Sequence, residues 1–184
     1  MDTNILQNNI IHAWTKCYNN HIFLANKDNE TIVIHDNLLN NNLIKKTYYI
    51  DNTDNALIYV NTKINHLIMH RCNNITLIIN SVIISGLDIF HSNNISIFNN
   101  SPCKAEYSFS FGENCVFTFN TTDLEITLCM QAVYNLIIKL VNERKPYRGC
   151  LNLFRAEPIY FFINNNTAGI NGFDTVYGNF TLTN

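Results

Sequence analysis

The sequence predicts an all-β protein, a right-handed parallel β-helix followed by a C-terminal β-hairpin. The first observation is an internal repeat, because residues 66–80 align with residues 86–100 without a gap, at an offset of 20. Self-similarity at such a spacing is typical of solenoids whose units stack on a shared core. The second is that apolar side chains alternate within each unit, which indicates strands. The third is an Asn-Asn pair in each unit, since asparagine tolerates the left-handed backbone of a sharp bend.

The chain divides by pattern into three parts. Residues 1–20 form a polar N-terminal segment, residues 21–171 form the β-helix domain, and residues 172–184 form the hairpin tail. Within the domain, residues 21–24 and 31–35 predict a strand pair, because both runs are apolar and turn-forming residues lie between them.

The coils are expected to begin at Thr47, with residues 48–50 and 56–60 forming the first one. The two clear repeats follow, then a third coil at the same offset and a fourth at a slightly shorter one. Burial of large apolar side chains, about 1.5–3 kcal/mol each, would hold the coils together. The predicted ladders are Ile75/Ile95/Cys115 and Leu77/Ile97/Phe117/Leu136. Cys115 is therefore interpreted as a packing residue of the core.

The repeat pattern stops near residue 142. Residues 142–152 contain the basic cluster of Arg144, Lys145 and Arg148, which we interpret as a solvated loop, with contact to an acidic partner as the alternative. Residues 158–163 predict another strand. Residues 173–183 resemble a hairpin with Gly-Asn as its turn. An isolated hairpin is marginally stable, so the tail is expected to dock on its own solenoid or on another copy.

Composition excludes several classes of partner. The 184 residues carry a formal net charge of −2, and only 14% are charged, so neither nucleic acid nor an anionic membrane is expected as a partner. No signal peptide or membrane-spanning stretch is visible, which predicts a cytoplasmic protein. The six cysteines are scattered without a CxxC pair, so we expect reduced thiols and no zinc site. Asparagine makes up about one residue in six, which β-helix corners, an AT-rich genome or both could explain, the genome more than the corners.

No catalytic motif is recognisable. His66 and His70 show no ligand spacing and no evident acidic third ligand for a metal, so satisfied surface or corner histidines are the simpler interpretation. Asp88 and Glu106 are expected in different coils, where they would not form the carboxylate pair that sugar hydrolysis needs. We therefore predict a protein that is not an enzyme and uses no cofactor or metal.

Several motifs together resemble the C-terminal domain of cyclase-associated protein and its relatives in the tubulin cofactor C group. They keep their order and approximate spacing over nearly the whole chain, from residue 30 to residue 183. The motifs are residues 31–36 (TIVIHD), 59–67 (YVNTKINHL), Cys72 with its Asn-Asn corner, 85–92 (SGLDIFHS), 112–115 (GENC) and 173–177 (FDTVY).

This resemblance implies a minimal single-domain protein, cytoplasmic and cytoskeleton-associated. It would bind ADP-bound actin monomers and promote their nucleotide exchange, and it would dimerise by exchanging C-terminal hairpin strands. The residues implied for actin binding, on a strand face offered to actin, are Asn61, Thr62, Lys63 and Asn65. Those implied for the exchanged hairpin are Phe173, Thr175, Val176, Tyr177, Phe180 and Leu182.

Two alternatives remain. In the tubulin cofactor branch, a Gln-x-Arg element supplies an arginine finger to GTP, and the protein would be a GTPase-activating or tubulin-binding module. The aligned positions here are residues 66–68, and Ile68 cannot supply a cation, which disfavours GTPase activation. The second alternative is a non-catalytic structural scaffold.

Overall fold

The structure is a computed structural model that describes residues 21–35, 46–121, 125–140, 147–153, 159–164 and 181–183. All regular elements in these ranges are strands. They are β1 (His21–Ala25), β2 (Thr31–Ile34), β3 (Thr47–Asp51), β4 (Leu57–Val60), β5 (Ile64–His70), β6 (Asn73–Ile79), β7 (Ile83–Phe90), β8 (Asn93–Asn99), β9 (Glu106–Phe119), β10 (Glu125–Leu140), β11 (Tyr147–Leu153), β12 (Ile159–Asn164) and β13 (Thr181–Thr183). In the described ranges no helix has the length and hydropathy needed to cross a membrane.

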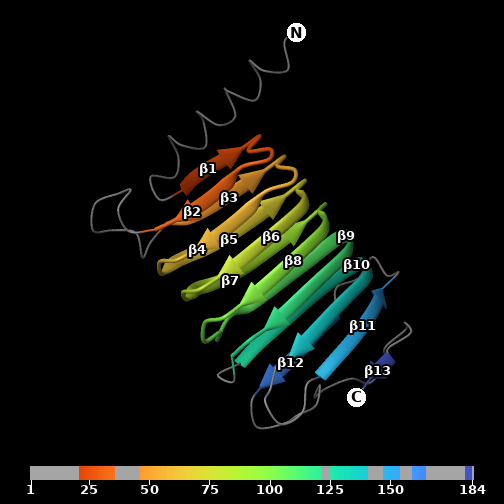
Figure 1. Cartoon of the computed structure of the whole chain (residues 1–184). Coiled ribbons are helices and arrows are strands. Elements are labelled where there is room, and N and C mark those ends of the chain that lie inside the picture. Colours follow the sequence, from red (N-terminus) through yellow and green to blue (C-terminus); the bar gives the residue numbers. More distant parts are fainter. Residues whose placement is uncertain are drawn as a thin grey trace.

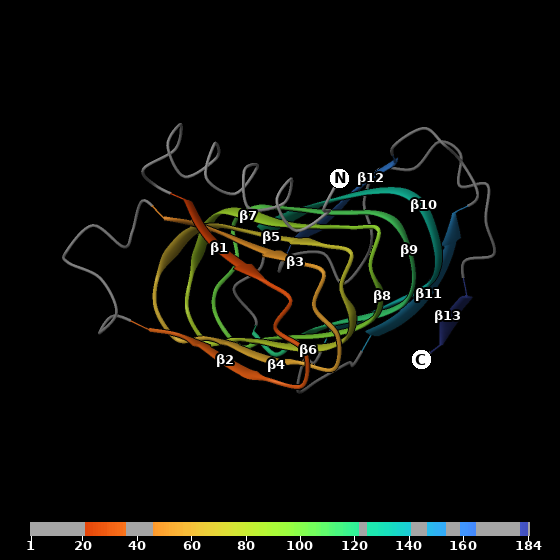
Figure 2. The same cartoon turned by 90° about the horizontal axis from the view of Figure 1, so that it is seen from above.

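The strands stack as flattened coils, which confirms the predicted parallel β-helix (Figure 1). One wall, the front sheet, contains β1, β3, β5, β7 and the first halves of β9 and β10. The opposite wall, the back sheet, contains β2, β4, β6, β8 and the second halves of β9 and β10. Figure 2 shows the two walls facing each other across the core. All pairings within both walls are parallel up to β10, as successive coils of a solenoid require.

The core consists of apolar ladders that run through the stack. The predicted succession Leu77, Ile97, Phe117 is confirmed, since these residues pair in register and each is at most 1% exposed. The next step was predicted wrongly: Ile138, not Leu136, pairs with Phe117, while Leu136 pairs with Cys115. The offset from β9 to β10 is thus 21 residues, longer than in the clear repeats and not shorter.

The predicted beginning and end of the coils also need correction. β1 pairs with β3 and β2 with β4, so the first coil begins at His21 and not at Thr47. At the other end, residues 147–152 of the predicted basic loop (142–152) lie in β11, which pairs antiparallel with β10. The predicted strand at residues 158–163 is confirmed as β12, also antiparallel to β10. The coil pattern ends here because the chain reverses direction.

One edge of the stack, the tight corner, turns within a few residues in every coil. Among the residues that the structure describes, twelve non-glycine residues have a positive φ, and they form pairs three residues apart. The second member of each pair is always asparagine, namely Asn29, Asn55, Asn74, Asn94, Asn114 and Asn135. The first members are Asn26, Asn52, Arg71, His91, Phe111 and Ala132. Asparagine adopts a positive φ at a low steric cost, so the corners explain part of the asparagine content.

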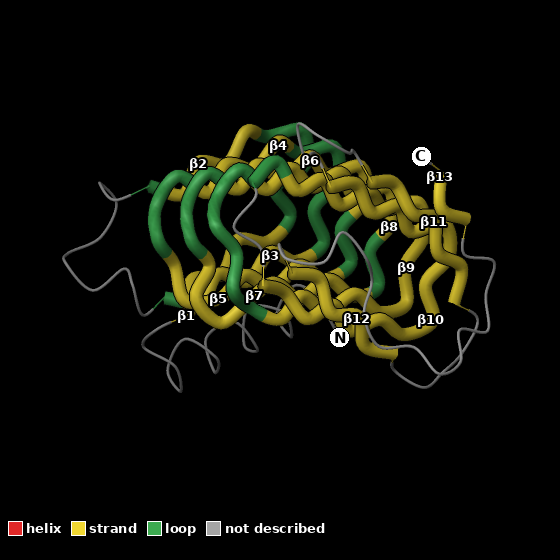
Figure 3. Tube along the Cα trace, turned by 90° about the horizontal axis from the view of Figure 1, so that it is seen from below, coloured by secondary structure: helices red, strands yellow, loops and turns green. Residues whose placement is uncertain are grey.

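Inside the tight corner, short side chains add hydrogen bonds to backbone carbonyl groups that already accept one from the neighbouring coil. The hydroxyls of Thr53 and Ser92 donate to the carbonyl oxygens two residues earlier, at 3.2 and 3.0 Å. The Cys72 thiol does the same with His70 at 3.4 Å. On the opposite edge, the wide corner, loops connect β4 to β5 and β6 to β7; they are green in Figure 3.

A candidate protein-binding face

The outer surface of the back sheet carries an apolar row. Val33, Tyr59, Ile78 and Phe98 pair in register across β2, β4, β6 and β8, and all point away from the core. Val33 is 39% exposed and Phe98 is 37% exposed. The parallel row, Leu57, Thr76, Ser96 and Val116, is uncharged and partly apolar. Contiguous exposed apolar surface of this kind marks sites of protein contact.

An asparagine ladder borders this apolar row along the wide corner. The Asn80 amide donates to Asn61 Oδ1 at 2.8 Å, that of Asn100 donates to Asn80 Oδ1 at 2.8 Å, and that of Asn120 donates to Asn100 Oδ1 at 2.7 Å. Each amide thus holds the next, which fixes a flat polar rim. An apolar centre with a polar rim is the usual anatomy of a protein interface.

The predicted site residues lie where this rim meets the turn between β4 and β5. Asn61 and Lys63 are exposed in the turn, and Asn65, in β5, accepts a hydrogen bond from Ser85 Oγ at 2.9 Å. Lys63 makes no ion pair with any residue that the structure describes. Thr62 is only 5% exposed, which corrects its expected place on a surface offered to a partner. Residues 61–63 form a turn between β4 and β5 and not a strand face, and Thr62 is buried in it.

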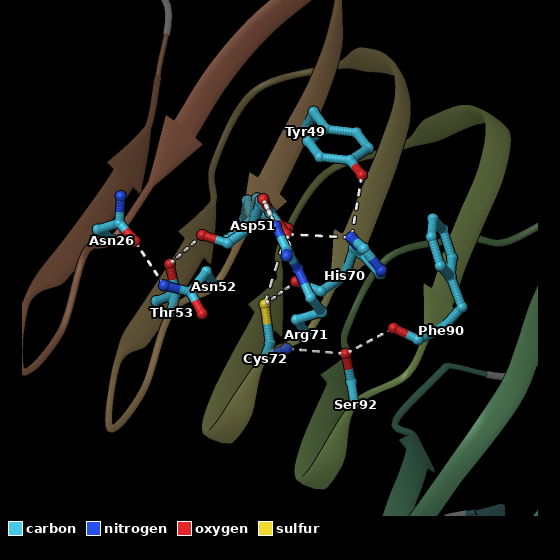
Figure 4. A network of polar contacts seen from close by, with 11 residues as sticks. Asn26, Tyr49, Asp51, Asn52, Thr53, His70, Arg71, Cys72, Phe90 and Ser92 are labelled. Carbon is cyan, nitrogen blue, oxygen red and sulfur yellow. Dashed lines mark hydrogen bonds and ion pairs between the residues drawn. The ribbon is translucent and has the colours of Figure 1, made fainter. Parts of the chain in front are cut away.

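A polar network occupies the tight corner of the front sheet (Figure 4). His70 Nδ1 lies 3.0 Å from Asp51 Oδ1 and 3.2 Å from the Tyr49 hydroxyl, and Arg71 forms a two-pronged hydrogen bond with the same carboxylate. His66 Nε2 also lies 3.0 Å from Asp88 Oδ2, without the alignment of a hydrogen bond. Each histidine thus lies beside one carboxylate, and the expected interpretation as surface or corner histidines stands for His70, which has polar partners.

The geometry and pKa values of this network suit a structural role. Burial lowers the pKa of His70 more than the Asp51 carboxylate raises it. Burial raises the pKa of Cys72 to about 11 and that of Cys115 to about 12, so neither thiol is an activated nucleophile. Cys115 is fully buried in its ladder, as predicted. In the described ranges no three ligand-type side chains converge as a metal site would require.

The comparisons with known proteins bear on this surface. The family described as "Adenylate cyclase associated (CAP) C terminal" matches residues 12–103, which is half of the chain. The chain belongs to this family.

A solved structure shares the fold. The crystal structure of cyclase-associated protein from Cryptosporidium parvum is similar to this chain, with 14% identity and a TM-score of 0.57, over 78% of this chain and 79% of that one. Identity at this level concerns the fold alone. The comparison with curated proteins gives no match.

The CAP match includes the whole β4–β5 turn and the apolar row as far as Phe98. It does not reach the C-terminal tail. There, β13 pairs antiparallel with β11 of the same chain, and Leu182 is opposite Gly149. The other predicted hairpin residues, Phe173, Thr175, Val176, Tyr177 and Phe180, lie outside the described residues, as do residues 1–20.

Sequence reasoning missed the apolar row, although a signal was present. The runs of β4 (LIYV) and β6 (ending ITLII) are apolar at nearly every position instead of alternating. Such runs indicate strands covered on both faces. Among the described residues, no second layer covers the back sheet. The apolar side chains of these runs that point outward therefore mark a contact surface.

Proposed function

We propose that this CAP-family chain is an actin-monomer-binding protein that favours ADP-actin and promotes nucleotide exchange on it. The chain performs no catalysis itself; it acts by binding one state of actin better than another. It works in the cytoplasm at the cytoskeleton, as a dimer joined through residues 172–184.

The observation that carries the proposal is the continuity of the back-sheet face with the predicted turn. Asn61 is at once the first rung of the asparagine ladder and the start of the segment that the CAP resemblance implies for actin contact. Two residues before it, Tyr59 belongs to the apolar row, and two residues after it, Lys63 is an exposed cation. A rigid, flat, repeat-built face of this kind suits a large protein partner better than a small ligand.

The test is a fluorescence assay of nucleotide release from ADP-actin, with and without the chain. The wild type is expected to accelerate release. Lys63→Ala is expected to weaken actin binding by about three- to tenfold while leaving the fold intact, because it removes an interface charge without touching the core. Phe98→Ser should have a comparable effect, through loss of apolar contact.

The matched control is Lys27→Ala, which removes an exposed lysine on the opposite, tight corner. Lys27 Nζ lies 3.4 Å from Glu30 in an exposed pair, which contributes little to stability. Equal binding by wild type and Lys63→Ala would remove Lys63 from the site. No effect of the wild type on actin, with acceleration of GTP hydrolysis in a single-turnover assay, would favour the tubulin cofactor alternative. An effect in neither assay would favour the remaining alternative, a non-catalytic structural scaffold.

A further inference from the structure

A shallow open groove of about 330 Å³ lies on the outer face of the front sheet, along β7 and β9. Its walls combine the carboxylates of Asp88 and Glu106 with the rings of Phe90, His91 and Phe111. This face is opposite the back-sheet face proposed for actin, so occupation of one leaves the other accessible (Figure 2).

The aromatic wall of the groove includes one exposed ring, that of Phe111. Phe111 is 45% exposed, and its ring stacks on His91 with centroids 5.0 Å apart and an interplanar angle of 10°. Phe90 stands edge-on to His91, with centroids 6.4 Å apart. His91 thus supports the Phe111 ring, and nearly half of Phe111 remains exposed beside the groove.

The charge of the groove is negative. Asp88 is engaged by His66 at 3.0 Å, whereas Glu106 is exposed and forms no ion pair with a described residue. Among the described side chains, no lysine or arginine lines the groove. Carboxylates beside exposed ring faces complement a group that is both cationic and planar, which is the chemistry of a guanidinium.

We propose that this groove binds an arginine side chain presented by a protein partner. A free small ligand fits less well, because such ligands need most of their surface enclosed, and this groove is open. Arginine fits better than lysine, because its guanidinium can stack on Phe111 while its N–H groups donate to a carboxylate. The site lets the chain hold a second protein while the back sheet holds its own partner.

The conformation of the tight corner allows the Phe111 ring to be removed without straining the backbone. At the position of Phe111, other coils have Asn26 and Asn52, with the same positive φ. Phe111→Asn therefore removes the ring while keeping a residue that the corner accepts. Glu106→Gln removes the charge at constant size. Glu113→Gln is the matched control, because Glu113 is an exposed carboxylate on the same strand but outside the groove.

The experiment is an NMR titration of the ¹⁵N-labelled full chain with the peptide acetyl-Gly-Arg-Gly-amide, beside the same peptide with citrulline in place of arginine. We expect saturable shifts of backbone amides around Glu106 and Phe111, with a dissociation constant on the order of 1 mM for this single side chain. Glu106→Gln and Phe111→Asn should each weaken binding about fivefold or more, and Glu113→Gln less than about twofold.

The proposal would be contradicted by equal shifts with the citrulline peptide or by shifts centred away from Glu106 and Phe111. Unchanged affinity in both groove variants, or no saturable shift at all, would contradict it as well. Peak dispersion in the spectra of the variants reports their folding. Nucleotide release from actin, measured with Glu106→Gln, should match the wild type, which separates this site from the proposed actin function.

Discussion

Ser92 Oγ accepts a hydrogen bond from the backbone N–H of Cys72 at 3.0 Å, across the step from one coil to the next. The same hydroxyl donates to the carbonyl oxygen of Phe90 at 3.0 Å, and Ser92 is fully buried. The Cys72 amide thus has a side-chain acceptor, while the Phe90 carbonyl oxygen accepts from Ser92 and also from the backbone N–H of Arg71 at 3.3 Å. The corners are therefore stabilised by specific polar contacts as well as by apolar packing.

Ser92→Ala should lower the free energy of unfolding by about 1–3 kcal/mol, because it leaves the Cys72 amide buried without an acceptor. Urea unfolding followed by circular dichroism measures the loss. Ser96→Ala is the control, since Ser96 is half-buried on the outer face of β8; it should change stability by less than about 0.5 kcal/mol. Equal losses in the two variants would contradict the assigned role of Ser92.

Asn94 tests the left-handed corner directly, because its φ is 55°. Asn94→Ala should be less stable than Asn94→Gly by about 1 kcal/mol, since alanine pays the steric cost of a positive φ and glycine does not. Both variants lose the 2.9 Å hydrogen bond from the Asn94 amide to Asn73. The difference between their urea midpoints therefore measures the steric cost of the positive φ at residue 94. Equal midpoints would contradict this cost.

His70 should make stability depend on pH. Burial lowers its pKa in the fold, so the unfolded chain binds more protons as the pH falls through the ordinary histidine range. Stability from this group is present above about pH 6.5 and is lost below it. The free energy of unfolding of the wild type and of His70→Gln can be compared at about pH 7.5 and pH 5.5. We expect it to fall less on acidification in the variant. An equal or larger loss would assign the effect to other groups.

The buried thiols should resist alkylation in the folded protein. With a pKa of about 11 for Cys72 and about 12 for Cys115, less than about one thiol in a thousand is ionised at pH 8. Iodoacetamide followed by peptide mass spectrometry should label both only after unfolding in urea. Cys129, which is half-buried on β10, is the internal reference and should react sooner. Rapid native labelling of Cys115 would contradict its place in the core.

The outward-facing chemistry was hard to predict, and the reasons are physical. Asp88 and Glu106 were expected in separate coils, and they do lie on different strands, yet they line one groove. Stacked strands are only about 4.8 Å apart, so residues about 20 positions apart in sequence become neighbours. The pairing of His66 with Asp88 arises in the same way, at a sequence separation that no short motif can reveal.

The repeat and the alternation of apolar residues by themselves determined a stacked coil with Leu77, Ile97 and Phe117 in one ladder. Both signals can be read from short stretches of sequence, because the repeat length sets the stacking and the alternation sets which side chains are buried. The asparagine pairs determined where it bends. Only the tertiary structure decided the register of Ile138, the first coil at His21, the exposed row ending at Phe98 and the groove beside Phe111. Those features depend on corner lengths, which differ from coil to coil by a residue or more, and a shift of one residue turns a side chain from the core to the surface.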